Sequence, residues 1–219
     1  MAMRQLLAEL TVAYTEPTTQ VVAIESVGGV DAAKRVQAAE AFDVVILASE
    51  AIDKLIAAGH LRADSKVDLV HSGVAVAVRA GASLPDIASE AAVRQAVLAA
   101  SSLSYSTGPS GVALAQLFER WGIAEQIKDH IVTAPPGVPV GSLVAKGEVA
   151  LGFQQLSELI HVAGINIVGP LPPAIQITTT FSAAMTTGCT RAPAVRALLD
   201  FMASPAAAPA KRRQGMEPA

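Results

Sequence analysis

Short apolar runs alternate with amphipathic stretches along this chain, and that alternation predicts an α/β fold. The first amphipathic stretch, residues 3–14, predicts a helix that Pro17 ends, because proline lacks the backbone N–H that a helix interior uses. Strands are expected at residues 20–25, 42–48, 67–79, 127–133, 149–154, 165–168 and 175–185. Further helices are expected at residues 31–40, 50–58, 87–99, 140–146, 156–163, 193–203 and 205–214.

Three of the expected strands have features of their own. Residues 42–48 have the apolar character of a strand that is buried on both faces. Residues 67–79 form a longer run that Ser72 and Gly73 interrupt, and residues 175–185 form an extended Thr-rich segment. Because the 219 residues can form two lobes of about 100 residues each, these two segments are expected to cross between lobes.

Residues 101–123 predict a strand, a loop and an amphipathic helix, and that order builds an anion site. The head of a helix has backbone N–H groups without partners in the helix, and the helix dipole adds partial positive charge there. The loop supplies hydroxyl donors and glycines at Ser106, Thr107, Gly108, Ser110 and Gly111. The glycines would let a ligand approach the backbone. In the alternative interpretation, Ser110 only caps the helix.

Two more serines follow expected strands, Ser26 after residues 20–25 and Ser49 after residues 42–48. The carboxyl ends of parallel strands lie at one edge of a sheet, where α/β proteins bind their ligands. A parallel sheet would therefore bring Ser26, Ser49 and the loop of residues 106–111 to one cleft.

Composition and charge narrow the choice of partner. Hydrophobic residues make up 52% of the chain and aromatic residues 4%, which favours α/β layers of small side chains. The net charge is −3 and basic residues cluster only at 211–213, so we expect no nucleic-acid partner. Cys189 is the single cysteine, which excludes an intrachain disulfide and zinc sites built on cysteine pairs. We expect a small buried residue there rather than a nucleophile, and neither a cofactor nor a metal.

The chain resembles the class II periplasmic solute-binding proteins, and within them the molybdate-binding-protein-like branch, which also includes aconitate isomerase-like proteins. The resemblance rests on the order of elements and on FDVVILASEAIDKLIAAGHL, VHSGVAVAVRAG, SLSYSTGPSGVALAQLFERWGI and FMASPAAAPAKRRQGMEP. It implies a two-lobed α/β fold whose lobes close on an oxyanion or a carboxylate. Lobe one would contain residues 1–76 and 177–219, and lobe two residues 77–176.

Carried over residue by residue, the resemblance implies ligand contacts at Ser26, Ser49, Ser72, Ser106, Thr107, Gly108, Ser110, Gly111 and Gln154. Ser110 and Gly111 are the foremost of these. Gln154 and Gln155 end a strand where the family places another cleft residue, and we choose Gln154 over Gln155. An exposed amide in a turn is the alternative for both.

The chain departs from the family at its start. It opens in a helix where family members have a β-strand with a ligand-contacting loop, and it begins without an export signal. An internal start would explain the missing first strand and the missing signal together. We therefore expect a periplasmic protein if a signal precedes this sequence, and a soluble one as written. A cytosolic protein that evolved without the strand is the rival explanation.

The leading functional hypothesis is a solute-binding protein that captures a small anion, an oxyanion or an organic carboxylate. It would serve an ABC-type importer, with the membrane component of that importer as its partner, and would carry out no chemistry of its own. Di- and tricarboxylates usually recruit arginine, for which Arg4 and Arg79 are candidates, although exposed arginines are more often solvated.

The alternative is an enzyme, an isomerase that moves a proton on an unsaturated tricarboxylate as aconitate isomerase-like proteins do. That reaction needs a general base near the substrate. His71, Glu25 and Glu50 are the nearest titratable candidates, although a structural role is the commoner one for each. A ligand-sensing domain of a regulator is a third hypothesis, but a DNA-binding segment should accompany it and none is present in this sequence.

Overall fold

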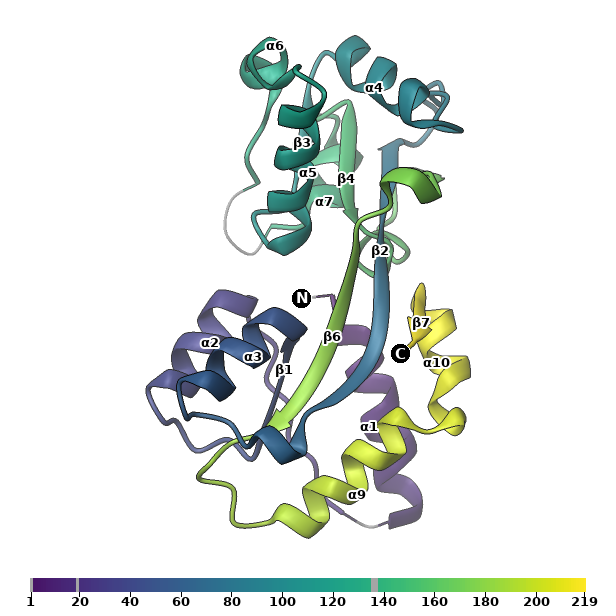
Figure 1. Cartoon of the computed structure of the whole chain (residues 1–219). Helices are drawn as coiled ribbons and strands as arrows, with labels where there is room; N and C mark the ends of the chain where they lie inside the picture. The colour runs from purple at the N-terminus through teal and green to yellow at the C-terminus, as the bar shows by residue number, and fades with distance from the viewer. Residues whose placement is uncertain (1, 19, 135–137) are drawn as a thin grey trace. The chain divides into compact units, whose positions relative to one another are not determined.

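The computed structural model describes residues 2–18, 20–134 and 138–219. The chain divides into two compact units: unit 1 comprises Met1–Ser72 and Thr179–Ala219, and unit 2 comprises Gly73–Thr178. Strand β2 (Val67–Arg79) contributes to both units as one continuous strand (Figure 1). The expected interruption within it is therefore wrong, because ladder pairing continues on either side of it.

Unit 1 combines antiparallel strands with helices. Its helices are α1 (Arg4–Thr18), α2 (Gly29–Gln37), α3 (Ser49–Ala57), α9 (Ala192–Ala203) and α10 (Ala208–Arg213). Besides the first part of β2, its strands are β1 (Val44–Ala48), β6 (Thr178–Met185) and β7 (Met216–Pro218). β1 pairs with β6 and β7 pairs with β2, in both cases antiparallel.

Unit 2 contains the parallel pair of strands. Its helices are α4 (Glu90–Ala99), α5 (Pro109–Arg120), α6 (Ala124–Ile127), α7 (Val140–Lys146) and α8 (Leu156–Leu159). Its strands, besides the second part of β2, are β3 (Leu103–Tyr105), β4 (Leu151–Gln155) and β5 (Ile165–Pro170). β2 pairs antiparallel with β4 and β5, whereas β3 runs parallel to β4.

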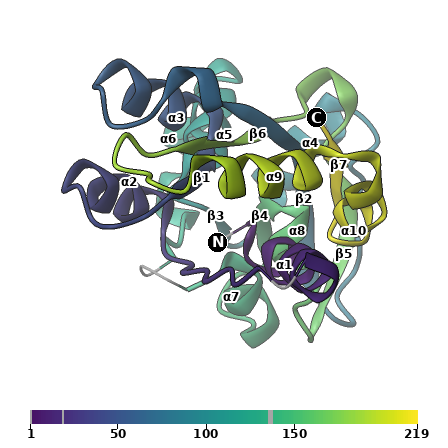
Figure 2. The ribbon, with the colours of Figure 1, turned by 90° about the horizontal axis from the view of Figure 1, so that it is seen from below.

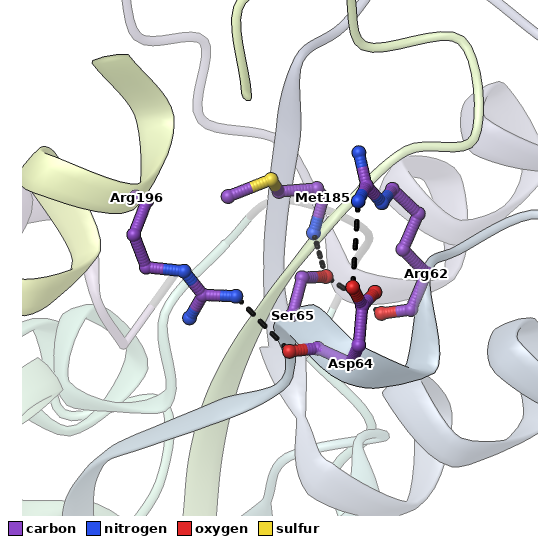
Figure 3. A network of polar contacts seen from close by, with 5 residues as sticks. All are labelled: Arg62, Asp64, Ser65, Met185 and Arg196. Carbon is purple, nitrogen blue, oxygen red and sulfur yellow. Dashed lines mark hydrogen bonds and ion pairs between the residues drawn. The ribbon is translucent and has the colours of Figure 1, made fainter. Parts of the chain in front are cut away.

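Short 3-10 turns join several of these elements. They are η1 (Ala63–Ser65), η2 (Lys128–His130), η3 (Pro173–Ile175) and η4 (Pro205–Ala207). The η1 turn carries a polar network that ties the start of β2 to the end of β6 (Figure 3). The Ser65 hydroxyl donates to the Arg62 carbonyl at 2.6 Å and accepts from the Met185 N–H at 2.8 Å, while Arg196 of α9 donates to the Asp64 carbonyl at 3.0 Å. This network links η1 to the end of β6 and to α9, and it involves no expected site residue.

Each unit has its own apolar core. In unit 1, α1, α9 and α10 are neighbours (Figure 2), and the ring of Tyr14 lies 5.4 Å from that of Phe201. In unit 2, Phe118 of α5 is buried with its ring 6.1 Å from that of Phe153 on β4. α5 packs against β4, and its head follows the end of β3, where the candidate site begins.

The mixed α/β fold predicted from the sequence is confirmed, but its sheet is mainly antiparallel. Among the strands that the structure describes, β3 and β4 form the one parallel pair. β1 is accordingly half-buried in alternation rather than buried on both faces, because it is the last strand of the sheet. The expected convergence of loops at one edge of a parallel sheet consequently applies only within unit 2.

Three local predictions are wrong. Residues 20–28 form no strand, because β1 ends the sheet and no described strand pairs with this segment. Most of residues 127–133 lies in α6 and η2, and only Ile131 makes a bridge, to Leu103. α1 continues through Pro17 to Thr18, since a proline in the last turn removes a single helical hydrogen bond.

Candidate functional site

The Gly/Ser/Thr loop of unit 2 joins the end of β3 to the head of α5, as the sequence predicts. The hydroxyl oxygens of Ser106 and Ser110 lie 3.1 Å apart, in hydrogen-bond contact. Ser110 is buried, with 4% of its surface exposed, whereas Thr107 is exposed. Two hydroxyl groups therefore meet at the positive end of a 12-residue helix, and each can donate or accept a hydrogen bond.

The alternative that Ser110 merely caps α5 is wrong. The N-cap position belongs to Gly108, which has no side chain to offer, and Ser110 lies inside the first turn. The Gly108 carbonyl accepts hydrogen bonds from the N–H groups of Gly111 at 3.0 Å and Val112 at 3.1 Å. The Ser110 hydroxyl consequently has no part in closing the helix, and Ser106 is its protein partner.

Gly111 has a structural reason to be glycine. A Cβ atom at this position would lie 1.5 Å from the carbonyl oxygen of Ser106, which is an impossible contact. A Cβ atom added at Gly108 would meet only Ser106 Oγ, at 3.9 Å, which is an ordinary contact. The backbone of the loop thus packs directly on the first turn of α5, and Gly111 sets the position of Ser106.

A pocket of about 180 Å³ opens beside this loop. It is lined by Tyr105, Ser106, Thr107, Gly111, Val112, Ala115, Ile131 and Thr133. The exposed lining is mainly apolar, from side chains that include those of α5 and the Ile131 segment, and hydroxyl-bearing residues such as Ser106 and Thr107 are also among the lining residues. Such a pocket can receive a small molecule that has both a carbon skeleton and an anionic group.

Gln154 lies at the end of the strand beside β3. Its side-chain oxygen accepts a hydrogen bond from the N–H of Gly141, in the first turn of α7, at 3.2 Å. Gln154 and Gln155 are both buried, with 4% of their surface exposed, so neither is an exposed amide in a turn. The oxygen of Gln154 therefore holds α7, and its amide NH₂ group is left to donate elsewhere.

Glu158, which the sequence reasoning did not consider, lies near Gln154. The carboxyl group belongs to the short helix α8, directly after β4, and the residue is half-buried. The pKa of Glu158 is raised from its ordinary value, chiefly by burial.

The three serines of unit 1 that were expected to contact a ligand differ in their burial and surroundings. Ser26 is exposed in the irregular segment 20–28, and Ser49 is the half-buried first residue of α3. Ser72 is completely buried in β2 opposite Met216, and its hydroxyl has no hydrogen-bond partner among the described residues. A ligand role for these three serines stays a prediction.

The candidate bases and arginines either contact other side chains or are exposed. The Nδ1 atom of His71 is 3.0 Å from the hydroxyl of Thr180, and Glu25 forms a 2.7 Å ion pair with Arg35. Glu50 is exposed in the first turn of α3. Of the candidate arginines, Arg4 is exposed in α1, and Arg79 ends β2 with its side chain beside Gly147.

Cys189 is half-exposed and free, rather than buried as expected. Across residues 2–18, 20–134 and 138–219, no three metal-binding side chains gather into a group. The same part of the chain contains no helix with the length and apolarity that crossing a membrane requires.

The arrangement of strands and helices is that of the periplasmic binding proteins. The periplasmic molybdate-binding protein of Azotobacter vinelandii has this fold with a TM-score of 0.80 at 20% identity, over 98% of this chain and 95% of that one. The PBP AgtB of A. tumefaciens R10, solved in complex with agropinic acid, has a TM-score of 0.71 at 11% identity, over 97% of this chain and 78% of that one.

The chain belongs to the bacterial extracellular solute-binding protein family, which residues 1–217 match. It is also 44% identical over 182 residues to an aconitate isomerase of Pseudomonas sp, an alignment that covers 82% of this chain and 68% of that protein. The resemblance drawn from the sequence is thereby confirmed.

Proposed function

We propose that this protein captures a small organic carboxylate at the loop of residues 106–111 in unit 2. The observation that carries the proposal is the Ser106 and Ser110 hydroxyl pair, 3.1 Å apart, at the head of α5 and beside a pocket of about 180 Å³. Hydroxyl donors and the helix dipole stabilise an anion without a fixed counter-charge. The apolar side of the pocket gives a carbon skeleton a surface to pack against.

Two observations favour an organic carboxylate over an inorganic oxyanion. The relative at 44% identity is named for aconitate, whereas the molybdate-binding structure shares 20% identity. Val112, Ala115 and Ile131 line the pocket with carbon atoms, which a bare oxyanion would not use. Membership of an extracellular solute-binding family supports a periplasmic location and delivery to an ABC-type importer.

Isomerisation of an unsaturated tricarboxylate is the second candidate function. The observation that favours it is the 44% identity to an aconitate isomerase. The two functions share one requirement, a site that binds a small polycarboxylate. They differ in whether a titratable group of the site exchanges a proton with the bound molecule.

Binding is tested by thermal shift and calorimetry with citrate, cis-aconitate, trans-aconitate, molybdate and sulfate. A ligand at 100 times its Kd stabilises the folded chain by about 2.7 kcal/mol, so a carboxylate of this class raises Tm in a concentration-dependent way. Ser106→Ala and Ser110→Ala should each weaken binding at least tenfold. Ser101→Ala, an exposed serine of the same unit, is the matched control and should leave binding unchanged.

A shift with molybdate or sulfate alone would contradict the carboxylate assignment and leave an oxyanion site. Carboxylate binding that survives both serine substitutions would contradict the assignment to this loop. No shift with any of the five anions would contradict anion capture itself.

A further inference from the structure

Val112, close to the head of α5, is an exposed apolar side chain in the wall of the pocket beside the binding loop. It lines that pocket, and 55% of its surface is exposed. Ala115 and Ile131 line the same pocket. Residues three apart are neighbours on one side of a helix, so Val112 and Ala115 form one apolar wall. A bound molecule that covers this wall removes apolar surface from water, which stabilises the complex.

The backbone sets the place of Val112 relative to the two hydroxyl groups of the site. The Val112 N–H donates to the Gly108 carbonyl at 3.1 Å, and Ser110 and Gly111 directly precede Val112 in α5. The backbone of Gly111 lies directly against the Ser106 carbonyl, so the loop and the helix are in contact. A valine in a helix has one strongly preferred rotamer. Its two methyl groups therefore have a defined position beside the hydroxyl pair.

We propose that Val112 is the residue by which this site selects anions that carry a carbon skeleton over bare oxyanions. The inference rests on the proposed function, because it needs an anion held by the hydroxyl groups of Ser106 and Ser110. An organic carboxylate in this position gains the polar contacts and also covers the methyl groups of Val112. An oxyanion such as sulfate gains the polar contacts alone.

Val112 has more free surface than the other two aliphatic side chains named above. Ala115 has a single methyl group and is half-buried. Ile131 is half-buried where it packs against the core of unit 2. Binding can therefore cover more apolar surface at Val112 than at either of these residues. Because Val112 is outside the core, a substitution there also leaves the packing of unit 2 intact.

The test uses the full chain and three variants, Val112→Thr, Val112→Ile and the control Val12→Thr. Threonine keeps the branched shape of valine and replaces one methyl group with a hydroxyl. Val12 is the matched control, because it is a valine of helix α1 in unit 1 with 57% of its surface exposed. Calorimetry at several temperatures measures Kd and the heat-capacity change of binding for trans-aconitate, citrate and oxalate. Oxalate is two joined carboxylates without any further carbon.

We expect Val112→Thr to weaken the binding of trans-aconitate at least about threefold, since one buried methylene group is worth about fourfold in affinity. Oxalate should change less than about 1.5-fold, because it has no carbon skeleton to cover the valine. Covering apolar surface makes the heat-capacity change of binding negative, so this change should be less negative for Val112→Thr with trans-aconitate.

The other two variants complete the expected pattern. Val112→Ile restores an apolar side chain and should bind trans-aconitate at least about threefold more tightly than Val112→Thr does. Val12→Thr should bind all three anions as the unsubstituted chain does. Without ligand, each variant should melt within about 2 °C of the unsubstituted chain, because both valines are exposed.

Several outcomes would overturn the proposal. An unchanged Kd and heat-capacity change for Val112→Thr would exclude Val112 and leave the capture function standing. Equal weakening of trans-aconitate and oxalate would mean that Val112 acts on the loop rather than on the carbon skeleton. If the unsubstituted chain binds citrate but not trans-aconitate, citrate takes its place in the comparison, and if it does not bind oxalate, the heat-capacity change decides. No binding of any anion by that chain would overturn both this inference and the proposed function.

Discussion

Residues 20–40 of unit 1 and residues 101–123 of unit 2 have the same predicted order of strand, loop and helix, yet only the second segment folds that way. In unit 2, β3 pairs with β4, and Leu103 also bridges to Ile131. In unit 1, residues 20–28 pair with no described strand, and Val21 is 92% exposed. A strand forms only where a neighbour accepts its backbone hydrogen bonds.

The consequence for the two loops follows directly. The loop after β3 is held by its strand and by the contact of Ser106 with Gly111, so its hydroxyl groups have defined positions. Ser26 lies in a segment without such support and is exposed. A serine in a loop becomes a defined donor only when the backbone on both sides is fixed.

The largest expected effect comes from filling the space at Gly111. Gly111→Ala would place a methyl group 1.5 Å from the Ser106 carbonyl, so the loop must move away from α5. We expect a loss of about 3 kcal/mol or more in the free energy of unfolding, measured by urea denaturation. Gly108→Ala, whose new atom would lie 3.9 Å from its nearest neighbour, is the matched control and should cost less than about 1 kcal/mol. Equal effects of the two substitutions would contradict this view of the loop.

Gln154→Leu should have the next largest effect. It removes the acceptor of the Gly141 N–H and leaves that donor unpaired at the start of α7. Loss of one partner of a buried hydrogen bond costs about 1–3 kcal/mol, which denaturant unfolding will measure. The exposed Gln126 of α6 provides the control, since Gln126→Leu should change stability by less than about 0.5 kcal/mol. If the two leucine variants are equally stable, Gln154 does not hold α7.

Lys211→Met tests the core of unit 1 and should stabilise it. Lys211 is 1% exposed, and among the residues that the structure describes it is the one charged residue that is buried. An apolar side chain of similar length avoids the cost of burying an amine, by roughly 1–2 kcal/mol at pH 7. Lys128→Met, at an exposed lysine of unit 2 that pairs with Glu125, should have little effect.

The pH dependence of this effect has a definite sign. Burial lowers the pKa of the Lys211 amine below its ordinary 10.5, so the unfolded chain binds the proton more tightly than the folded chain does. The contribution of Lys211 to the free energy of unfolding therefore rises as pH rises through the folded-state pKa and levels off above about 10.5. The advantage of Lys211→Met should shrink over the same range in thermal unfolding at pH 7–10. An advantage that grows with pH would contradict the lowered pKa.

The smallest effects are expected in residues 20–28. Val21→Ser and Ser26→Ala change exposed side chains in a segment without ladder pairing, so each should alter stability by less than about 0.5 kcal/mol in thermal unfolding. A cost of 2 kcal/mol or more at Val21 would mean that this segment packs more tightly than its exposure indicates.

Local patterns in the sequence were enough to predict several elements. Helix α7 begins and ends at the expected residues, and β2 has the expected bounds, because continuous apolar runs and helical periodicity are strong local signals. The strand at residues 127–133 could not be excluded in this way, since an apolar run that short fits a strand, a helical turn or a loop equally well.

The candidate site was predictable only in part. The Gly/Ser/Thr loop before an amphipathic helix is a local signal, and it gave Ser106 and Ser110. The end of β4 becomes a neighbour of this loop only through the parallel pairing of β3 with β4, which brings together segments about 50 residues apart in the sequence. No local pattern contains that pairing.

The sequence by itself determined the α/β class, the family and the loop at the head of α5, because periodicity, turn residues and helix starts depend on neighbours along the chain. The tertiary structure decided the mainly antiparallel sheet, the fate of residues 20–28 and the roles of Gln154 and Gly111. Those features depend on which backbone groups and side chains meet across space. Hydrogen-bond pairing and close packing select them only once the chain has folded.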